Sequence, residues 1–237
     1  MDTILFDLDG TLLPMDITAF KKKYFDLLIK FFTCKNYNAN IVLKGVMAGS
    51  AQMIKNNGKN TNEEVFWRTF ESVSGYKGEE IKPLFLEFYE HDFQMVENTC
   101  SSNPIVVKAI SILRDKGYRI ICATNPIFPK VASVSRLRWS GVDVDAFEEI
   151  TTFENYHYCK PNSKYFSEVM ERFKLNPDTC LMVGNDAQED MAIKALGIPV
   201  YLISDHLICR EQDEIKEADY VSDANEFLKF VQSLPCI

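Results

Sequence analysis

The chain has 237 residues, 46% of them hydrophobic, and a formal net charge of −8 at pH 7. Such a chain can bury a sizeable core, either as one domain or as a core with an inserted subdomain, and its negative charge argues against a nucleic-acid partner, because sequence-independent phosphate contacts need a basic surface. The sequence has seven cysteines without a CxxC pair and no signal-peptide pattern, which predicts a cytoplasmic protein. It has no apolar run of about 20 residues, so no membrane partner is expected.

The first predicted strand ends in two carboxylates. An apolar run at residues 4–6, closed by a turn at Gly10, is typical of a strand buried on both faces of a parallel sheet. Asp7 and Asp9 should point the same way, roughly 6–7 Å apart, because successive side chains of a strand alternate faces. Open α/β sheets bind ligands at this edge, where Thr11 adds a hydroxyl. The pair predicts a bound cation or a raised pKa on one carboxyl. An Asx turn with solvated aspartates is the alternative. An EF-hand calcium loop is excluded, because it needs Gly and Glu at its sixth and twelfth positions, where this chain, counted from Asp7, has Leu12 and Thr18.

The next stretch, from residue 16 to about 96, has helical periodicity. Apolar residues three and four positions apart predict one helix around residues 20–31 and others near 41–54, 63–73 and 79–93. About 80 helical residues are too many for a simple crossover, so they predict an inserted helical cap at residues 14–102, called the helical insert below. Its aromatic side chains are interpreted as packing. Candidates for pointing at the site are Asp16, Phe20 and Lys44.

Helices and strands alternate from residue 103 onward. Helices are predicted at 105–116, 128–139, 163–173, 190–196 and from the Asp223 cap to Val231, and strands at 119–123, 180–183 and 200–203. This alternation indicates right-handed βαβ units. The predicted fold is therefore α/β: a Rossmann-like parallel sheet between layers of helices, built from residues 1–13 and 103–237.

Three further segments place polar residues at strand ends or helix starts. Thr124 and Asn125 follow the second strand, where a hydroxyl and backbone N–H groups can hold a phosphoryl oxygen, although a Thr-Asn-Pro turn is also ordinary loop chemistry. Lys160 precedes a predicted helix and offers a compact positive charge, or is simply solvated. Asp186 and Asp190 follow the third predicted strand; hard oxygen ligands there suit Mg²⁺, and Asp190 has the alternative role of a helix cap.

The order of these pieces resembles the four motifs of the haloacid dehalogenase-like hydrolases, a superfamily made up largely of magnesium-dependent phosphatases. The residues that carry the resemblance are Asp7-Leu8-Asp9-Gly10-Thr11, Thr124, Lys160-Pro161, and Gly184-Asn185-Asp186 with the trailing Asp190. The helical insert resembles the cap of the phosphoglycolate-phosphatase and phosphoglucomutase-like branches. Many relatives carry Asp directly after the glycine of the fourth motif, where this chain has Asn185, so the metal is assigned to Asp186 with Asn185 as a helper.

The resemblance implies a Mg²⁺-dependent phosphomonoester hydrolase acting on a small phosphorylated metabolite. Asp7 would be the nucleophile and Asp9 the general acid and base, and an acidic residue at position 9 indicates phosphoryl transfer rather than dehalogenation. Mg²⁺ would bind Asp7, Asp9 through its backbone carbonyl, and Asp186, while Asp190 would orient Lys160 and the metal-bound water. The implied phosphate-binding residues are Thr124, Asn125, Lys160, Gly10 and Thr11, of which Thr124 and Lys160 are also catalytic.

Two alternatives remain open from the sequence. A phosphomutase of the phosphoglucomutase-like branch would pass the Asp7 phosphate to a sugar instead of water. A non-catalytic binding or regulatory protein would keep the fold without turnover, although the presence of the nucleophile, the acid and the lysine disfavours this reading. The sequence does not identify the metabolite or the oligomeric state.

Overall fold

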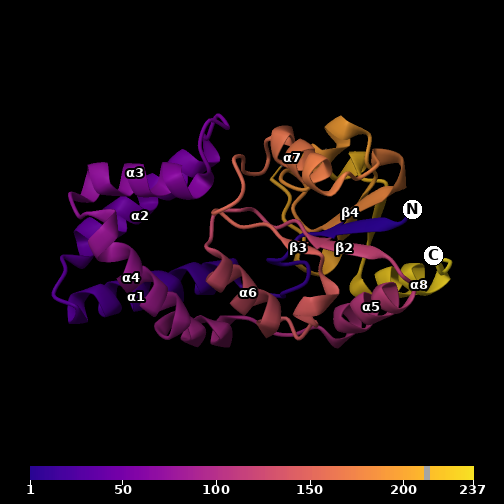
Figure 1. Ribbon diagram of the computed structural model, residues 1–237. Helices are drawn as coiled ribbons and strands as arrows, with labels where there is room; N and C mark the ends of the chain where they lie inside the picture. The colour runs from indigo at the N-terminus through magenta and orange to yellow at the C-terminus, as the bar shows by residue number, and fades with distance from the viewer. Residues whose placement is uncertain (211–213) are drawn as a thin grey trace.

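Six parallel strands form one sheet in the computed structural model, which describes residues 1–210 and 214–237 (Figure 1). All neighbouring strands are parallel, and their order is β3-β2-β1-β4-β5-β6. The strands are β1 (Thr3–Phe6), β2 (Arg119–Cys122), β3 (Glu149–Ile150), β4 (Cys180–Gly184), β5 (Val200–Ile203) and β6 (Tyr220–Ser222). The predicted α/β fold with a parallel sheet is confirmed.

Strand β1 lies at the centre of the sheet, where the strand order reverses. The chain leaves β1 toward β2 on one side and later returns to β4 on the other side. Backbone hydrogen bonds continue just past its end, because the Asp7 N–H donates to Val183 O over 2.9 Å and the Ala123 N–H donates to Phe6 O over 2.7 Å. Such a reversal opens a crevice at the carboxyl ends of the strands, which is where this fold class binds ligands.

Helices cover both faces of the sheet. Helices α5 (Pro104–Asp115) and α8 (Ala224–Ser233) lie together on one face and α7 (Ser163–Phe173) lies on the other, with α6 (Lys130–Trp139) toward the helical insert (Figure 1). The alternation of β1 fits these two layers: Ile4 and Phe6 belong to the apolar cluster with Phe227, while Leu5 belongs to the cluster with Phe166. Burial on both faces explains why β1 is a continuous apolar run.

Four α-helices lie between β1 and α5 in the chain and are gathered together beside the sheet (Figure 1). They are α1 (Ile17–Cys34), α2 (Ala39–Ile54), α3 (Asn62–Ser74) and α4 (Gly78–Glu90), followed by the 3₁₀ segment η1 (Asp92–Thr99). Helices α2 and α3 pack closely because Gly45 and Gly49 have no side chain: an added Cβ would lie 2.6 Å from a ring carbon of Phe70 or Phe66, respectively. The aromatic side chains of the helical insert are largely buried, as the periodicity predicts.

The structure differs from the sequence-based expectations mainly at segment ends and sheet edges. The predicted helix at 79–93 ends at Glu90, because the backbone of His91 leaves the helical region with φ −121° and ψ −75°. The predicted helix at 190–196 is the 3₁₀ segment η4 (Met191–Leu196). Strands β3 and β6 were not predicted, since they have two and three residues and give no clear alternation. Within the described residues, no helix combines the length and apolarity needed to cross a bilayer.

Candidate active site

The loop after β1 carries Asp7 and Asp9 into one cavity, while Leu8 between them is fully buried in the core. This alternation is the predicted one. Gly10 follows with φ +90°, and a Cβ there would lie 2.2 Å from Asn185 Nδ2. Position 10 therefore requires glycine for its backbone angle and for the close approach of the β4 loop.

Lys160 lies behind Asp7 and joins it to Asp190. Its Nζ donates to Asp7 Oδ1 over 2.8 Å and to Asp190 Oδ1 over 2.7 Å, and all three side chains are almost completely buried. The predicted contact of Asp190 with Lys160 is thus present. Burial alone would lower the pKa of Lys160, but the two carboxylates raise it well above its ordinary value. One ammonium shared by two carboxylates leaves one excess negative charge in a buried place.

The cost of burying this excess charge appears in the pKa of Asp7. Burial raises the pKa of this carboxyl to about 8, against the opposing effect of Lys160, and the Asp190 and Asp9 carboxylates raise it further. A divalent cation beside Asp7 would offset this charge and favour the ionised carboxylate. The sequence-based expectation of a raised pKa on one member of the aspartate pair agrees with this value.

The loop after β4 is organised around Asp190. Its Oδ2 accepts hydrogen bonds from the backbone N–H groups of Asn185 (3.0 Å) and Asp186 (2.9 Å). Gly184 makes room for this carboxylate, because a Cβ at that position would lie 2.1 Å from Asp190 Oδ2. The Asn185 side chain ties the two acidic loops together: its Oδ1 accepts from the Thr11 hydroxyl over 2.9 Å, and its Nδ2 donates to His206 O over 2.7 Å.

Asp186, the predicted metal ligand, is held by several donors. Its Oδ1 accepts from the backbone N–H groups of Gln188 and Glu189, and Arg210 binds both carboxylate oxygens at 2.7 and 2.9 Å. Burial acts to raise the pKa of Asp186, but the hydrogen bonds from Arg210 and from these N–H groups hold it below its ordinary value. The Asp186 carboxylate therefore faces the cavity as an anion with a cation already beside it.

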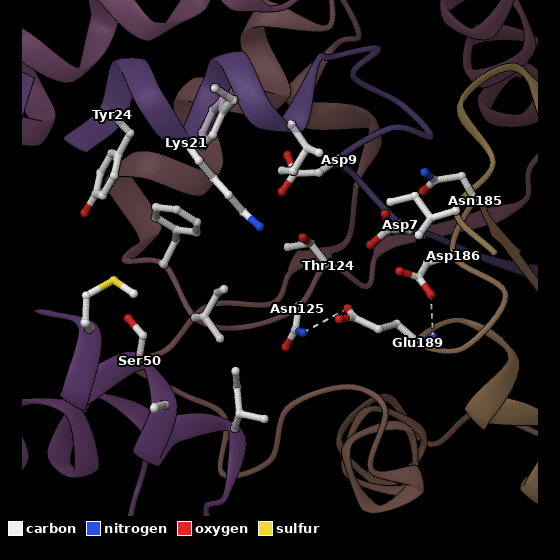
Figure 2. A pocket seen from close by; sticks show the side chains of 18 of the residues that line it. Asp7, Asp9, Lys21, Tyr24, Ser50, Thr124, Asn125, Asn185, Asp186 and Glu189 are labelled. Carbon is white, nitrogen blue, oxygen red and sulfur yellow. Dashed lines mark hydrogen bonds between the residues drawn. The ribbon is translucent and has the colours of Figure 1, made fainter. Parts of the chain in front are cut away.

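The residues after β2 line the same cavity. Thr124 is buried, and its backbone oxygen is fixed by the hydroxyls of Thr151 (2.6 Å) and Tyr165 (2.9 Å). Asn125 connects two loops: its Oδ1 accepts from the Lys160 N–H over 3.2 Å, and its Nδ2 donates to Glu189 Oε2 over 3.0 Å (Figure 2). Thr124 is thereby held in place at the predicted phosphate position.

Some predicted site residues lie behind the cavity wall rather than on it. Among residues 1–210 and 214–237, the lining includes Asp7, Asp9, Thr124 and Asn125 but not Gly10, Thr11 or Lys160. The Thr11 hydroxyl is already committed to Asn185. Of the three candidates from the helical insert, Phe20 lines the cavity, whereas Asp16 caps α1 by accepting from the Thr18 and Ala19 N–H groups and Lys44 lies elsewhere.

The sequence reasoning missed a second buried cation, Arg136 on α6. Its guanidinium forms an ion pair with Asp9 Oδ2 and lies over the ring of Phe128, 4.3 Å from the ring centre. A weak signal was available, because Arg136 falls on the same helical face as the apolar Ala132 and Trp139, which are also buried. Glu189 and Arg210, also missed, become part of the site only through the fold.

The acidic residues of the cavity fit a hard cation. Asp7, Asp9 and Asp186 all line it, and Asp9 Oδ1 is buried with no hydrogen-bond partner among the described residues. No set of three or more potential ligand side chains is assembled for a metal within the described part of the chain. Mg²⁺ does not need one, because it takes one or two carboxylates and keeps several waters.

The cavity itself has a volume of about 660 Å³ and lies between the carboxyl edge of the sheet and helices α1 and α2 (Figure 2). Its polar floor consists of Asp7, Asp9, Thr124, Asn125, Asn185, Asp186, Glu189 and Asp190. The opposite side comes from the helical insert and is mostly apolar. This is the size and composition of a site for a small organic molecule.

Comparisons with known proteins agree with this geometry. The model of the family described as haloacid dehalogenase-like hydrolase matches residues 1–197. Pyrophosphatase PpaX from Bacillus mycoides is 24% identical over 226 residues, which cover 94% of this chain and 93% of the relative. A crystal structure of a HAD phosphatase from Thermococcus onnurineus matches with a TM-score of 0.62 and 19% identity over 100% of both chains. YfnB from Bacillus subtilis, described as bound to magnesium, matches with a TM-score of 0.56 and 21% identity over 98% of this chain and 99% of that one.

Proposed function

Because the chain belongs to the haloacid dehalogenase-like hydrolases, we propose that it is a Mg²⁺-dependent phosphomonoester hydrolase that acts through an aspartyl-phosphate on Asp7. The predicted family and the predicted enzyme class, a hydrolase, are confirmed by the family match. The observation that carries the finer proposal is the position of Asp7. Its carboxylate follows the central strand, lines the cavity and is oriented by the buried Lys160.

The proposed reaction has two steps. An oxygen of Asp7 attacks phosphorus, the bond between phosphorus and the alcohol breaks, and Asp9 gives its proton to the departing alkoxide. Asp9 then takes a proton from a water molecule, which attacks the aspartyl-phosphate and releases inorganic phosphate and free Asp7. Arg136 holds one oxygen of Asp9 and leaves the other, Oδ1, without a hydrogen-bond partner in the described residues, so Oδ1 is the atom that supports this proton transfer.

The other floor residues bind and orient. The Thr124 hydroxyl and the backbone N–H of Asn125 hold phosphoryl oxygens, and Lys160, fixed by Asp190, keeps the attacking carboxylate in place. Asp7, Asp186 and the backbone carbonyl of Asp9 would hold Mg²⁺, whose charge would offset that of the nucleophile and of the phosphoryl oxygens.

The domain organisation, partner and location belong to the same proposal. Residues 1–13 and 103–237 form the catalytic core, and residues 14–102 form a cap that excludes water from the reacting atoms. Support comes from the cavity, which residues of α1 and α2 complete opposite the floor. The substrate is a small phosphorylated metabolite, and a cytoplasmic location is supported by the buried thiols of Cys122, Cys159 and Cys180.

Phosphate release from a panel of phosphomonoesters, measured with Mg²⁺ and with EDTA, tests the proposal. We expect Mg²⁺-dependent release that falls by at least about 1,000-fold in Asp7→Asn, because the nucleophile is removed. Asp26→Asn is the matched control, since Asp26 is exposed on α1 away from the cavity lining. Equal release by Asp7→Asn and the wild type would contradict the assignment of the nucleophile.

A further inference from the structure

The helical insert presents an exposed apolar stripe to the nucleophile. Met47, Ala51 and Ile54 follow one another at spacings of four and three residues along α2 and line the cavity opposite Asp7. On α1, the exposed Ile17 and the buried Phe20 continue this surface. These five residues are called the apolar wall. Met47 and Ile54 are 54% and 51% exposed, which is unusual for large apolar side chains.

Internal packing does not account for this stripe. Helix α2 already buries another face against α3 through Gly45, Gly49 and Met53. Met47, Ala51 and Ile54 belong to neither apolar core cluster of the described residues, yet all three line the cavity. Aromatic rings extend the same surface, because Phe25 and Phe128 also line the cavity.

Few of the lining residues that the helical insert contributes are polar, in contrast to the floor. From the helical insert they are Lys21, Tyr24 and Ser50. The Tyr24 hydroxyl is buried and already hydrogen-bonded to the Tyr89 hydroxyl at 2.9 Å. Figure 2 shows the Lys21 amine pointing into the cavity. Hydroxyls of a substrate placed against this side of the cavity would mostly lack partners, and burying an unpaired hydroxyl is costly.

We infer that the substrate is a phosphomonoester whose alcohol carries an apolar body about the size of an aromatic ring, rather than a sugar phosphate or another small polar ester. This inference rests on the proposed phosphatase function and specifies its substrate class. The phosphate lies on the polar floor, the apolar body lies against the wall, and Lys21 binds an acceptor or anionic group at the edge of that body.

A matched series of alkyl phosphates tests the inference. Propyl phosphate, 3-hydroxypropyl phosphate and 3-phenylpropyl phosphate share a primary alkoxide leaving group, so the series varies chiefly in what meets the wall. We expect kcat/KM for the phenyl ester to exceed that for propyl phosphate by at least about tenfold, as burial of a ring predicts. The 3-hydroxypropyl ester should be no better than propyl phosphate.

Variants locate the effect on the wall. In Ile54→Asn the ratio of kcat/KM between the phenyl and propyl esters should fall by at least about threefold, because an amide replaces apolar contact surface. Val73→Asn is the control, since Val73 is 48% exposed on α3 and does not line the cavity; its ratio should equal that of the wild type. A preference for the hydroxypropyl ester, or a ratio unchanged in Ile54→Asn, would overturn the inference.

A binding measurement separates this inference from the proposed function. Calorimetry with the non-hydrolysable propylphosphonate and 3-phenylpropylphosphonate, in the presence of Mg²⁺, reports the wall without turnover. Tighter binding of the phenyl compound by at least about tenfold supports the substrate class even if no ester is hydrolysed. Equal binding of the two phosphonates would mean that the apolar wall does not bind the ring. That result would overturn the inference even if Asp7-dependent phosphate release is observed.

Discussion

The polar floor and the apolar wall of the cavity are built on opposite principles. In the floor, buried charges are joined in a network: Lys160 contacts two carboxylates, and Asp190 also accepts two backbone N–H groups. In the wall, Met47 and Ile54 are about half exposed and have no such network. The floor is therefore fixed before a ligand arrives, whereas the wall has surface left for a ligand to cover. This difference assigns the shared chemistry to the floor and the choice of substrate to the wall.

Removing the central cation of the floor should have the largest effect. Lys160→Met leaves Asp7 and Asp190 buried without their counter-charge, and we expect a loss of about 3–5 kcal/mol in the free energy of unfolding, measured by urea denaturation. Lys108→Met is the control, because Lys108 is exposed on α5. An equal loss of less than about 1 kcal/mol in both variants would show that the floor is not a coupled network.

The pH dependence of stability should report the excess charge at Asp7. Its pKa is about 8 in the folded chain and 3.8 ordinarily, so the folded state keeps a proton on this carboxyl where the unfolded state has lost it. The contribution of Asp7 to the free energy of unfolding is therefore at its maximum below about pH 4. It decreases as the pH rises to about 8, by at most about 1.4 kcal/mol per pH unit.

Asp7→Asn isolates that contribution because the amide does not titrate. In metal-free buffer, the unfolding free energy of the wild type should decrease relative to that of Asp7→Asn between about pH 5 and pH 8, as measured by denaturation at each pH. A difference that stays constant, or one that grows in favour of the wild type, would contradict the buried excess charge.

Arg210 provides a smaller test at the edge of the floor. Its side chain is 45% exposed, so Arg210→Gln should change the free energy of unfolding by no more than about 1 kcal/mol. Because Arg210 and a cation compete for the Asp186 carboxylate, the variant should bind Mg²⁺ more tightly by about threefold to tenfold in a calorimetric titration. Weaker Mg²⁺ binding would instead indicate that Arg210 positions Asp186 for the metal.

The smallest effect is expected at the wall. Ile54→Asn should change the unfolding free energy by no more than about 0.5 kcal/mol, since Ile54 is half exposed and packs little apolar surface in the described structure. Ile4→Asn, on the fully buried central strand, serves as the contrast and should cost several kcal/mol. A large destabilisation by Ile54→Asn would mean that the wall is part of the core, and the floor and the wall would then not differ in this respect.

Much of the floor was predictable because its residues follow strands that the sequence marks clearly. Strands β1, β4 and β5 are continuous apolar runs, and the parallel arrangement brings Asp7, Thr124 and Asp186 to one edge. The metal assignment to Asp186 and the boundaries of the helical insert remain predictions.

What the sequence left open depends on contacts between distant segments. Arg136 and Asp9 are 127 residues apart, and their pairing appears only when α6 packs against the loop after β1. The apolar wall was hidden in the same way: a helix with two apolar faces predicts burial of both, and only the fold leaves one of them open to the cavity. Strands β3 and β6 are too short to give a period-two pattern.

The aspartyl-phosphate on Asp7 can be tested most directly by mass spectrometry of the enzyme quenched in acid during turnover of a hydrolysed ester. We expect one added phosphoryl group on the peptide that contains Asp7, present with Mg²⁺ and absent in Asp7→Asn, with Asp26→Asn labelled like the wild type. Rapid turnover in which no phosphoryl group is trapped on Asp7, or in which the group is found on another residue, would contradict it.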